Sequence, residues 1–233
     1  MAKKGNRRHL KRIATKKRLA IKEKKAKKFI MKPMPGRHNK DSTWSLLFLL
    51  RDKLAIAKTK KEAKYILNKG IVKVDGKVIK KLDYPIGLFD IINISGETYV
   101  IVLDKKGRLD VIKAKIDHKP LKIKNKVSIK PGLWQLTFHD GTTKLVKDNS
   151  IKVGYTVIYD LNKKEIKEIK RPEQNALCLI TDGKHAGQIA KLEDIKDMQG
   201  KKEATLKIDN EKIITKLNYL FFLPDEWQKL LSK

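Results

Sequence analysis

The alternation of apolar and polar positions between residues 42 and 104 predicts two short helices followed by strands. In the first helix, Leu47, Leu50 and Leu54 recur at helical spacing, which gives the helix one apolar face. The polar residues of this segment fall mostly outside that face. The helix is therefore expected to bury its leucines against a small core.

The second predicted helix carries signals at both of its ends. It opens at Thr59 with Glu62 three residues later, which is the spacing of a capping box, and Gly70 follows as a C′ glycine. Valines then alternate with lysines on either side of Asp75-Gly76, a strong signal for a tight hairpin turn. This stretch therefore predicts a helix, a sharp stop and a β-hairpin.

Short strands are expected in the remainder of the chain. Gly96 is expected to lie in the turn that joins the preceding strand to a strand over 97–103. His139 and Asp140 precede Gly141 at a predicted hairpin turn, where Asp-Gly is expected for backbone reasons, so we assign them no catalytic role. Further strands are expected within 121–129, 133–138, 142–146, 156–160, 165–169, 176–181, 188–192, 204–208 and 213–217.

These patterns predict an α+β fold that is mostly β. The expected divisions are a basic N-terminal extension over 1–41, a helix-pair and hairpin module over 42–104, a β-rich middle domain over 105–171, and a C-terminal β unit with a tail over 172–233. Apolar residues near the end of the chain are expected to close a core, namely Leu220, Phe221, Phe222 and Trp227.

The charge of the chain favours polyanions as partners. Its 233 residues include 56 Lys and Arg against 26 Asp and Glu, a net charge of +30 with a pI near 10.0. The first 40 residues hold 12 Lys and 5 Arg against the single acid Glu23, a net +16. Self-repulsion makes a packed structure unexpected through Lys28 in the free protein. The segment is either a solubilising or nuclear-import tail, or one that folds when it binds RNA.

Several classes of site and location are not expected. Gly183-Lys184 lacks the spacing and the hydroxyl residue of a phosphate-binding loop, the histidines are scattered, and no segment of roughly 100 residues is left for a catalytic domain. We expect no catalytic residue, metal, cofactor, small-molecule substrate or homo-oligomer. The longest apolar run is too short to span a bilayer, no secretory signal follows the basic N-terminus, and the lone Cys178 fits a reducing compartment.

The two predicted helices and the hairpin together resemble a known RNA-binding unit. The order is a leucine-rich helix with Arg51-Asp52, then T-x-x-E-A-K from Thr59, then Gly70, then V-K-V-D-G-K. This order is similar to the alpha-L RNA-binding motif. The resemblance implies an RNA backbone lying across the helix pair, where it contacts Arg51, Lys60, Lys61 and Lys64. Any one lysine taken alone is more typical of solvated surface than of RNA binding, and the set as a whole favours RNA binding.

Other parts of the chain resemble one family more specifically. Residues 5–17, 33–38 and 150–161 are similar to the e-type small-subunit ribosomal protein four of archaea and eukaryotes. The segment after Asn175 resembles a KOW motif in a small SH3-like barrel, with Lys184 facing RNA or protein. In that motif Gly187 supplies a sharp turn, and Gly183 lies in the same loop.

The whole-chain resemblance implies a structural constituent of the small ribosomal subunit in the cytoplasm. Its expected partners are ribosomal RNA, held mainly through phosphate-backbone and shape contacts, and neighbouring ribosomal proteins. A KOW-bearing transcription or translation factor and an RNA-modification accessory protein are the alternatives. The candidate RNA-binding residues are Arg7, Arg8, His9, Lys11, Arg12, Lys16, Lys17, Arg37, His38, Arg51, Lys58, Lys60, Lys61, Lys64, Lys69, Lys73, Lys77 and Lys184, and the structural turns are Gly70, Gly76, Gly183 and Gly187.

Overall fold

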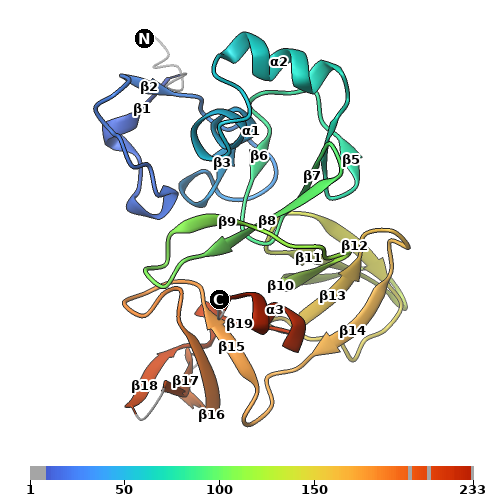
Figure 1. Cartoon of the computed structure of the whole chain (residues 1–233). Coiled ribbons are helices and arrows are strands. Elements are labelled where there is room, and N and C mark those ends of the chain that lie inside the picture. Colours follow the sequence, from blue (N-terminus) through green and yellow to red (C-terminus); the bar gives the residue numbers. More distant parts are fainter. Residues whose placement is uncertain (1–8, 199–200, 209–210, 232–233) are drawn as a thin grey trace, which may run out of the picture. The chain divides into compact units, whose positions relative to one another are not determined.

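The computed structural model describes residues 9–198, 201–208 and 211–231 and consists mostly of antiparallel strands, as expected (Figure 1). The chain divides into two compact units. Unit 1 extends to Ile101 and includes Val111–Lys113, and unit 2 comprises Val102–Asp110 and the chain from Ala114 onward. Within the described ranges, no helix is long and apolar enough to cross a bilayer.

The N-terminal segment of unit 1 packs from residue 9 onward, so the prediction of an unpacked segment through Lys28 is wrong there. Leu19 is 4% exposed, and its carbonyl oxygen accepts a hydrogen bond of 2.8 Å from the Trp44 indole. Arg12 is buried and forms an ion pair of 3.2 Å with Asp52. Apolar anchors and internal pairing therefore offset the self-repulsion. The segment contains β1 (Leu10–Lys11), η1 (Arg12–Ala14), η2 (Lys17–Leu19), β2 (Phe29–Ile30) and η3 (Lys40–Ser42).

The first predicted helix is shorter and wider than its sequence pattern indicates. An α-helical turn, α1 (Leu46–Phe48), continues as a π-helix, η4 (Leu49–Lys53), in which the Leu54 amide donates to the Leu49 carbonyl at 2.9 Å. Leu47 and Leu50 are buried as expected, whereas Leu54 is only half-buried. The widened turn shifts the later residues around the axis, so the apolar face does not continue to Leu54.

The second helix, α2 (Lys60–Asn68), begins and ends as predicted. Thr59 Oγ1 accepts from the Glu62 amide at 3.2 Å, and the Glu62 carboxylate in turn accepts from the Lys58 amide at 2.8 Å. Ala63 and Leu67 are fully buried on its inner side. Gly70 follows the helix with a φ of +73°, the left-handed conformation that ends many helices.

Unit 1 contains most of a five-stranded sheet of order β5-β4-β7-β8-β9. The predicted hairpin forms at Asp75-Gly76, where φ values of 48° and 77° give the left-handed pair of a type I′ turn. A second such turn at Ser95-Gly96 joins β7 to β8. The strands of this sheet are β4 (Val72–Val74), β5 (Lys77–Val78), β7 (Ile91–Ile94), β8 (Glu97–Leu103) and β9 (Leu109–Lys113). A separate antiparallel pair is formed by β3 (Trp44–Ser45) and β6 (Pro85–Ile86).

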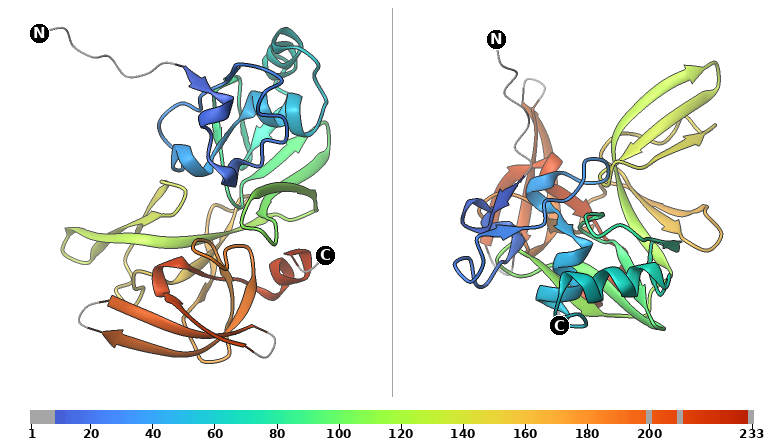
Figure 2. Two further views of the ribbon diagram at one scale, coloured as in Figure 1. Left: turned by 90° about the vertical axis from the view of Figure 1, so that its left-hand side faces the viewer. Right: turned by 90° about the horizontal axis from the view of Figure 1, so that it is seen from above.

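The first sheet of unit 2 has the order β12-β11-β10-β13-β14. Both views in Figure 2 show β10 and β11 as a long hairpin. The core beside it contains Ile123, Leu136, Phe138 and Val157. The predicted strands are all present, as β10 (His118–Lys130), β11 (Leu133–Phe138), β12 (Thr143–Val146), β13 (Thr156–Asp160) and β14 (Ile166–Lys170).

The second sheet of unit 2 has the order β18-β17-β16-β15-β19 and its own apolar core. The prediction that the final apolar residues close a core is confirmed, because Leu220, Phe221, Phe222 and Trp227 are each at most 2% exposed. Closure of this sheet into a KOW barrel stays a prediction, as do the four domain boundaries. The elements are β15 (Leu177–Ile180), β16 (Ile189–Met198), β17 (Lys201–Ile208), β18 (Glu211–Lys216), η5 (Leu217–Tyr219), β19 (Leu220–Phe222) and α3 (Asp225–Leu231).

Candidate nucleic-acid interface

The exposed side of α2 and the hairpin that follows it carry a set of lysines. Val72 and Val74 point into the core, so Lys73 between them points outward. On α2, burial of Ala63 and Leu67 likewise leaves the lysines on the opposite side. All of these lysines are exposed, and we call them the lysine surface: Lys58, Lys60, Lys61, Lys64, Lys69, Lys73 and Lys77.

One acid within the lysine surface is used for capping. The Glu62 carboxylate accepts from the Lys58 amide at 2.8 Å and from the Thr59 hydroxyl at 3.1 Å. The backbone hydrogen bond from Lys58, followed by that from the Thr59 side chain, lowers the pKa of Glu62 below its ordinary value of 4.5. Its charge is thus held at the helix start, while Lys60, Lys61 and Lys64 remain directed toward solvent.

Arg51 differs from the exposed lysines because its guanidinium group already donates hydrogen bonds to the neighbouring Asp52 carboxylate. Its Nε and Nη2 donate to Asp52 Oδ2 at 2.9 and 2.7 Å. Asp52 Oδ1 also accepts from Arg12 Nη1 at 3.2 Å. One carboxylate therefore bridges two guanidinium groups, and a phosphate would have to compete with Asp52 for Arg51.

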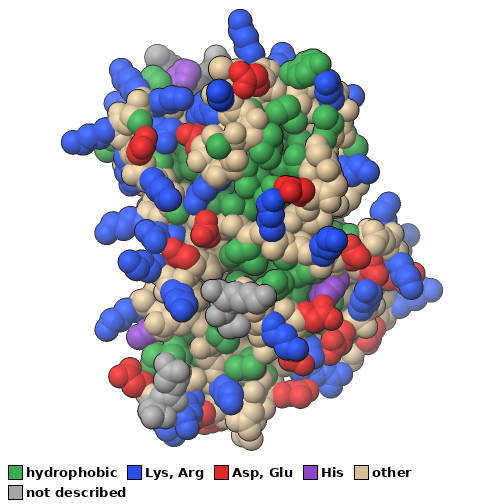
Figure 3. All heavy atoms as spheres, in the orientation of Figure 1, with side chains coloured by type: hydrophobic (Ala, Val, Ile, Leu, Met, Phe, Trp, Pro, Cys, Tyr) green, Lys and Arg blue, Asp and Glu red, His purple; other side chains and the backbone are tan. Residues whose placement is uncertain are grey.

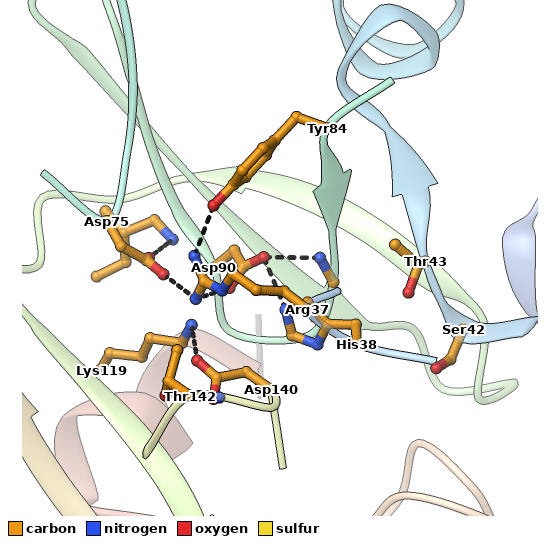
Figure 4. A network of polar contacts seen from close by, with 12 residues as sticks. Arg37, His38, Ser42, Thr43, Asp75, Tyr84, Asp90, Lys119, Asp140 and Thr142 are labelled. Atoms are coloured by element: carbon orange, nitrogen blue, oxygen red, sulfur yellow. Dashed lines mark hydrogen bonds and ion pairs between the residues drawn. The ribbon is translucent and has the colours of Figure 1, made fainter. Parts of the chain in front are cut away.

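Arg37 and His38 lie inside unit 1 in a network of polar contacts (Figure 4). The Arg37 guanidinium lies 2.5 Å from Asp75 Oδ2 and 3.4 Å from Asp90 Oδ1, and it donates to the Tyr84 hydroxyl at 3.2 Å. His38 Nε2 lies 2.9 Å from Asp90 Oδ2. The structure thus joins these two predicted RNA-binding residues to internal carboxylates, as it does Arg12, and it does not bring them to the lysine surface.

The other predicted residues of the N-terminal segment are exposed, namely His9, Lys11, Lys16 and Lys17. Arg7 and Arg8 lie outside the described residues. Figure 3 shows Lys and Arg side chains spread over the visible face, with hydrophobic side chains between them. The basic character predicted from composition is therefore a property of the surface.

Lys184 lies in unit 2, exposed in the turn between β15 and β16. Asp182 Oδ1 accepts from the Gly183 amide at 2.9 Å, and Gly183 has a φ of +93°. Gly187 has a φ of +90°, and a Cβ there would lie 1.9 Å from the Asp104 carbonyl oxygen. Both glycines therefore adopt a backbone conformation that favours glycine, and Gly187 leaves no room for a Cβ, while a role for Lys184 in binding stays a prediction.

Comparison with known proteins identifies the family. The S4 domain model matches residues 49–92, and the model described as Ribosomal family S4e matches residues 95–166. Small ribosomal subunit protein eS4 of Methanocaldococcus jannaschii is 37% identical over 97% of this chain and 98% of that protein. This chain belongs to ribosomal family S4e.

Other S4e relatives agree over most of their length. The eS4 protein of Nanoarchaeum equitans is 34% identical over 95% of this chain and 97% of its own. The crystal structure of 30S ribosomal protein S4e from Thermoplasma acidophilum superposes with a TM-score of 0.70 at 31% identity, covering 78% of this chain and 95% of that one. The resemblance seen in the sequence is confirmed, and the S4 domain match contains α2 and the β4–β5 hairpin, which carry the lysine surface.

Sequence reasoning about this S4e chain missed its buried polar pairs. Asp140 was expected only to form a turn. Its carboxylate accepts a hydrogen bond from the Thr142 amide, as turn residues do, but it also forms a buried ion pair of 3.1 Å with Lys119. Asp90 was not singled out, although it is fully buried and accepts from the Gly87 amide at 2.8 Å. No local pattern marks these pairs, because Lys119 lies 21 positions from Asp140 and His38 lies 52 positions from Asp90.

Proposed function

We propose that this chain is a structural constituent of the small ribosomal subunit that binds ribosomal RNA, mainly through phosphate-backbone and shape contacts. The observation that carries the proposal is the lysine surface, which lies in the part of the chain matched by the S4 domain. The names of the relatives support it, since proteins called small ribosomal subunit protein eS4 align with nearly the whole chain.

The physical basis of binding is the exchange of counterions for lysines. Lysines that project from a rigid helix and a tight hairpin neutralise phosphates and release the ions condensed on RNA. Such contacts fix position and orientation without reading bases. The net charge of +30 adds a long-range attraction. This role requires no turnover and no cofactor.

The proposal includes the setting in which the chain acts. Its partners are small-subunit ribosomal RNA and neighbouring ribosomal proteins, and its location is the ribosome in the cytoplasm. Lys184 and the exposed N-terminal lysines supply further phosphate contacts within the assembled subunit.

The salt dependence of binding tests the lysine surface. On small-subunit ribosomal RNA transcribed from the genome that encodes this chain, Lys60→Ala and Lys64→Ala should each flatten the slope of log affinity against log salt by roughly 0.7 to 1. Arg51→Ala should flatten it less, because Asp52 already pairs with Arg51. Lys113→Ala serves as a matched control, since Lys113 forms an ion pair of 2.8 Å with Glu97 outside this surface.

The salt slopes of the variants show whether the lysine surface binds RNA. If Lys60→Ala and Lys64→Ala behave like Lys113→Ala, the lysine surface is not the RNA-binding face. Sedimentation of a cell lysate, with and without a high-salt wash, tests the structural role separately. One copy per small subunit after the wash is expected, and loss in the wash would instead indicate a transiently bound factor.

A further inference from the structure

Unit 1 contains a pocket of about 630 Å³ beside the β1–β2 pair, which is labelled in Figure 1. The pocket is lined by residues of the N-terminal segment and by the chain between Lys32 and Asp41. Its volume lies within the range of roughly 300 to 1,000 Å³ that is usual for small-ligand sites. Leu19 and Pro33 contribute apolar lining, so the pocket is not merely a gap between charged side chains.

The charged lining of this pocket favours an anion. Lys11, Lys16, Lys32 and Lys40 line it together with His9, whereas Asp41 is the one acid among the lining residues that the structure describes. The positive charges of four lysines that line one pocket repel one another, and a phosphate bound there reduces that repulsion. A neutral or cationic ligand would not gain this energy.

An aromatic group lines the same pocket. Phe29 is 45% exposed although it lies in a strand, and its ring centroid is 5.4 Å from that of His9 at an interplanar angle of 46°. The amine of Lys28 lies 5.5 Å from the Phe29 ring centroid. Exposed aromatic rings flanked by cations are the usual platform on which unpaired nucleic-acid bases stack.

Taken together, the geometry points to a site for one unpaired nucleotide of RNA, with its base stacked on Phe29 and its phosphates among the lysines. This inference rests on the proposed ribosomal RNA binding and deepens it. It adds a base-contacting site to a surface otherwise assigned to backbone contacts. The S4 domain match begins at residue 49, so this pocket lies outside it.

The affinity of three variants for the small-subunit ribosomal RNA transcript tests the site. Phe29→Ala should weaken binding roughly 5- to 150-fold, the range for loss of one stacked base. The salt slope should not change, because no phosphate contact is removed. Phe29→Trp should retain binding, because it keeps a stacking ring. Ile13→Ala is the matched control, since Ile13 is an exposed apolar residue, 69% exposed, in the same segment outside the pocket lining.

A cross-linking experiment locates the contact directly. Ultraviolet irradiation of the full chain bound to the transcript should attach a nucleotide to Phe29 or His9. Trypsin does not cut between Lys32 and Pro33, so after digestion with trypsin and nuclease the peptide 29–37, or the peptide 9–11 that contains His9, is expected to carry the mass of one nucleotide. An excess of free nucleoside monophosphate should reduce this product in competition.

Several outcomes would overturn the site. Equal affinities for Phe29→Ala and Ile13→Ala would show that no base stacks on Phe29, and loss of binding in Phe29→Trp would show that ring shape rather than stacking matters. In the assembled subunit, a cross-link from this peptide to another protein would assign the pocket to an acidic peptide. If Lys60→Ala and Lys64→Ala still flatten the salt slope in these cases, the proposed function stands and only the nucleotide site fails.

Discussion

The amine of Lys122 donates a hydrogen bond of 2.6 Å to the carbonyl oxygen of Leu220, although 98 positions separate these residues. The same amine donates to the Asn218 carbonyl oxygen at 2.8 Å. Lys122 belongs to β10 and Leu220 begins β19, so one side chain ties together the two sheets of unit 2. It supplies a donor to backbone carbonyls that the strand ladders leave unpaired.

Titration of Lys122 predicts a specific pH dependence of stability. Burial, followed by the charge on Lys124, lowers the pKa of Lys122 from 10.5 to about 8. Between these values the unfolded chain holds a proton that the folded protein has released, so this group makes stability rise with pH from about 8 to 10.5. The difference in unfolding free energy between wild type and Lys122→Met should therefore grow across that window, by on the order of 3 kcal/mol.

Chemical denaturation at a series of pH values measures this difference. Lys126→Met is the control for loss of one positive charge, because Lys126 is a half-buried lysine of the same strand that donates to Asn149. A difference that stays constant with pH for Lys122→Met would show that Lys122 does not release its proton in this window.

Gly187 should tolerate no side chain. Besides its positive φ, an added Cβ would lie 1.9 Å from the Asp104 carbonyl oxygen and 2.7 Å from the Gly107 amide nitrogen. Gly132 also has a positive φ, of 75°, but its Cβ would meet nothing within 4 Å. Gly132→Ala should lose about 1 kcal/mol, and Gly187→Ala at least about 2 kcal/mol more, as measured by urea denaturation. Equal losses would mean that the segment around Asp104 moves aside at little cost.

Loss of the buried charge of Asp90 should lower the stability of unit 1. The Asp90 carboxylate is fully buried and accepts from the Gly87 amide, His38 and Arg37. Asp90→Asn leaves the cationic partner less compensated and should cost about 3 kcal/mol of unfolding free energy. Glu97→Gln is the matched control in the same unit, because the Glu97–Lys113 pair is exposed to solvent and should contribute little to stability. Similar losses for the two variants would contradict a special role for the buried network.

Packing of the N-terminal segment should depend on Trp44. Trp44→Phe keeps most of the buried ring but removes the donor to the Leu19 carbonyl oxygen. Loss of one buried hydrogen bond costs about 1 kcal/mol, so cleavage by trypsin after Lys16 and Lys17 should accelerate roughly fivefold. Trp134→Phe, in unit 2, is the control and should leave cleavage at these sites unchanged. An unchanged rate in Trp44→Phe would show that apolar contacts alone hold the segment.

The parts of the fold that local chemistry dictates could be read from the sequence. Thr59, Glu62 and Gly70 define the ends of α2 through contacts a few residues apart, and Asp75-Gly76 specifies a turn that few other dipeptides adopt. Because Val72 and Val74 must face the core, the exposure of Lys73 between them follows from alternation alone. The lysine surface was predictable for these reasons.

Local patterns could not reveal where the charges of the N-terminal segment go. The high net charge of this segment and its few apolar residues predicted that it would not pack. Arg12 pairs with Asp52, 40 positions away, and the Trp44 indole donates to Leu19, 25 positions away. These partners are brought together by the fold, so their contribution is invisible to a count of charges.

The sequence by itself determined the helix caps, the turns, the strand pattern, the basic surface and the family. The tertiary structure alone decided which cations remain available to a ligand: it joined Arg37 to Asp75 and Asp90, left Lys64 exposed on α2, and placed Phe29 beside lysines in a pocket. The reason is that caps and turns depend on neighbours along the chain, whereas burial and pairing of a charge depend on residues that only folding brings near.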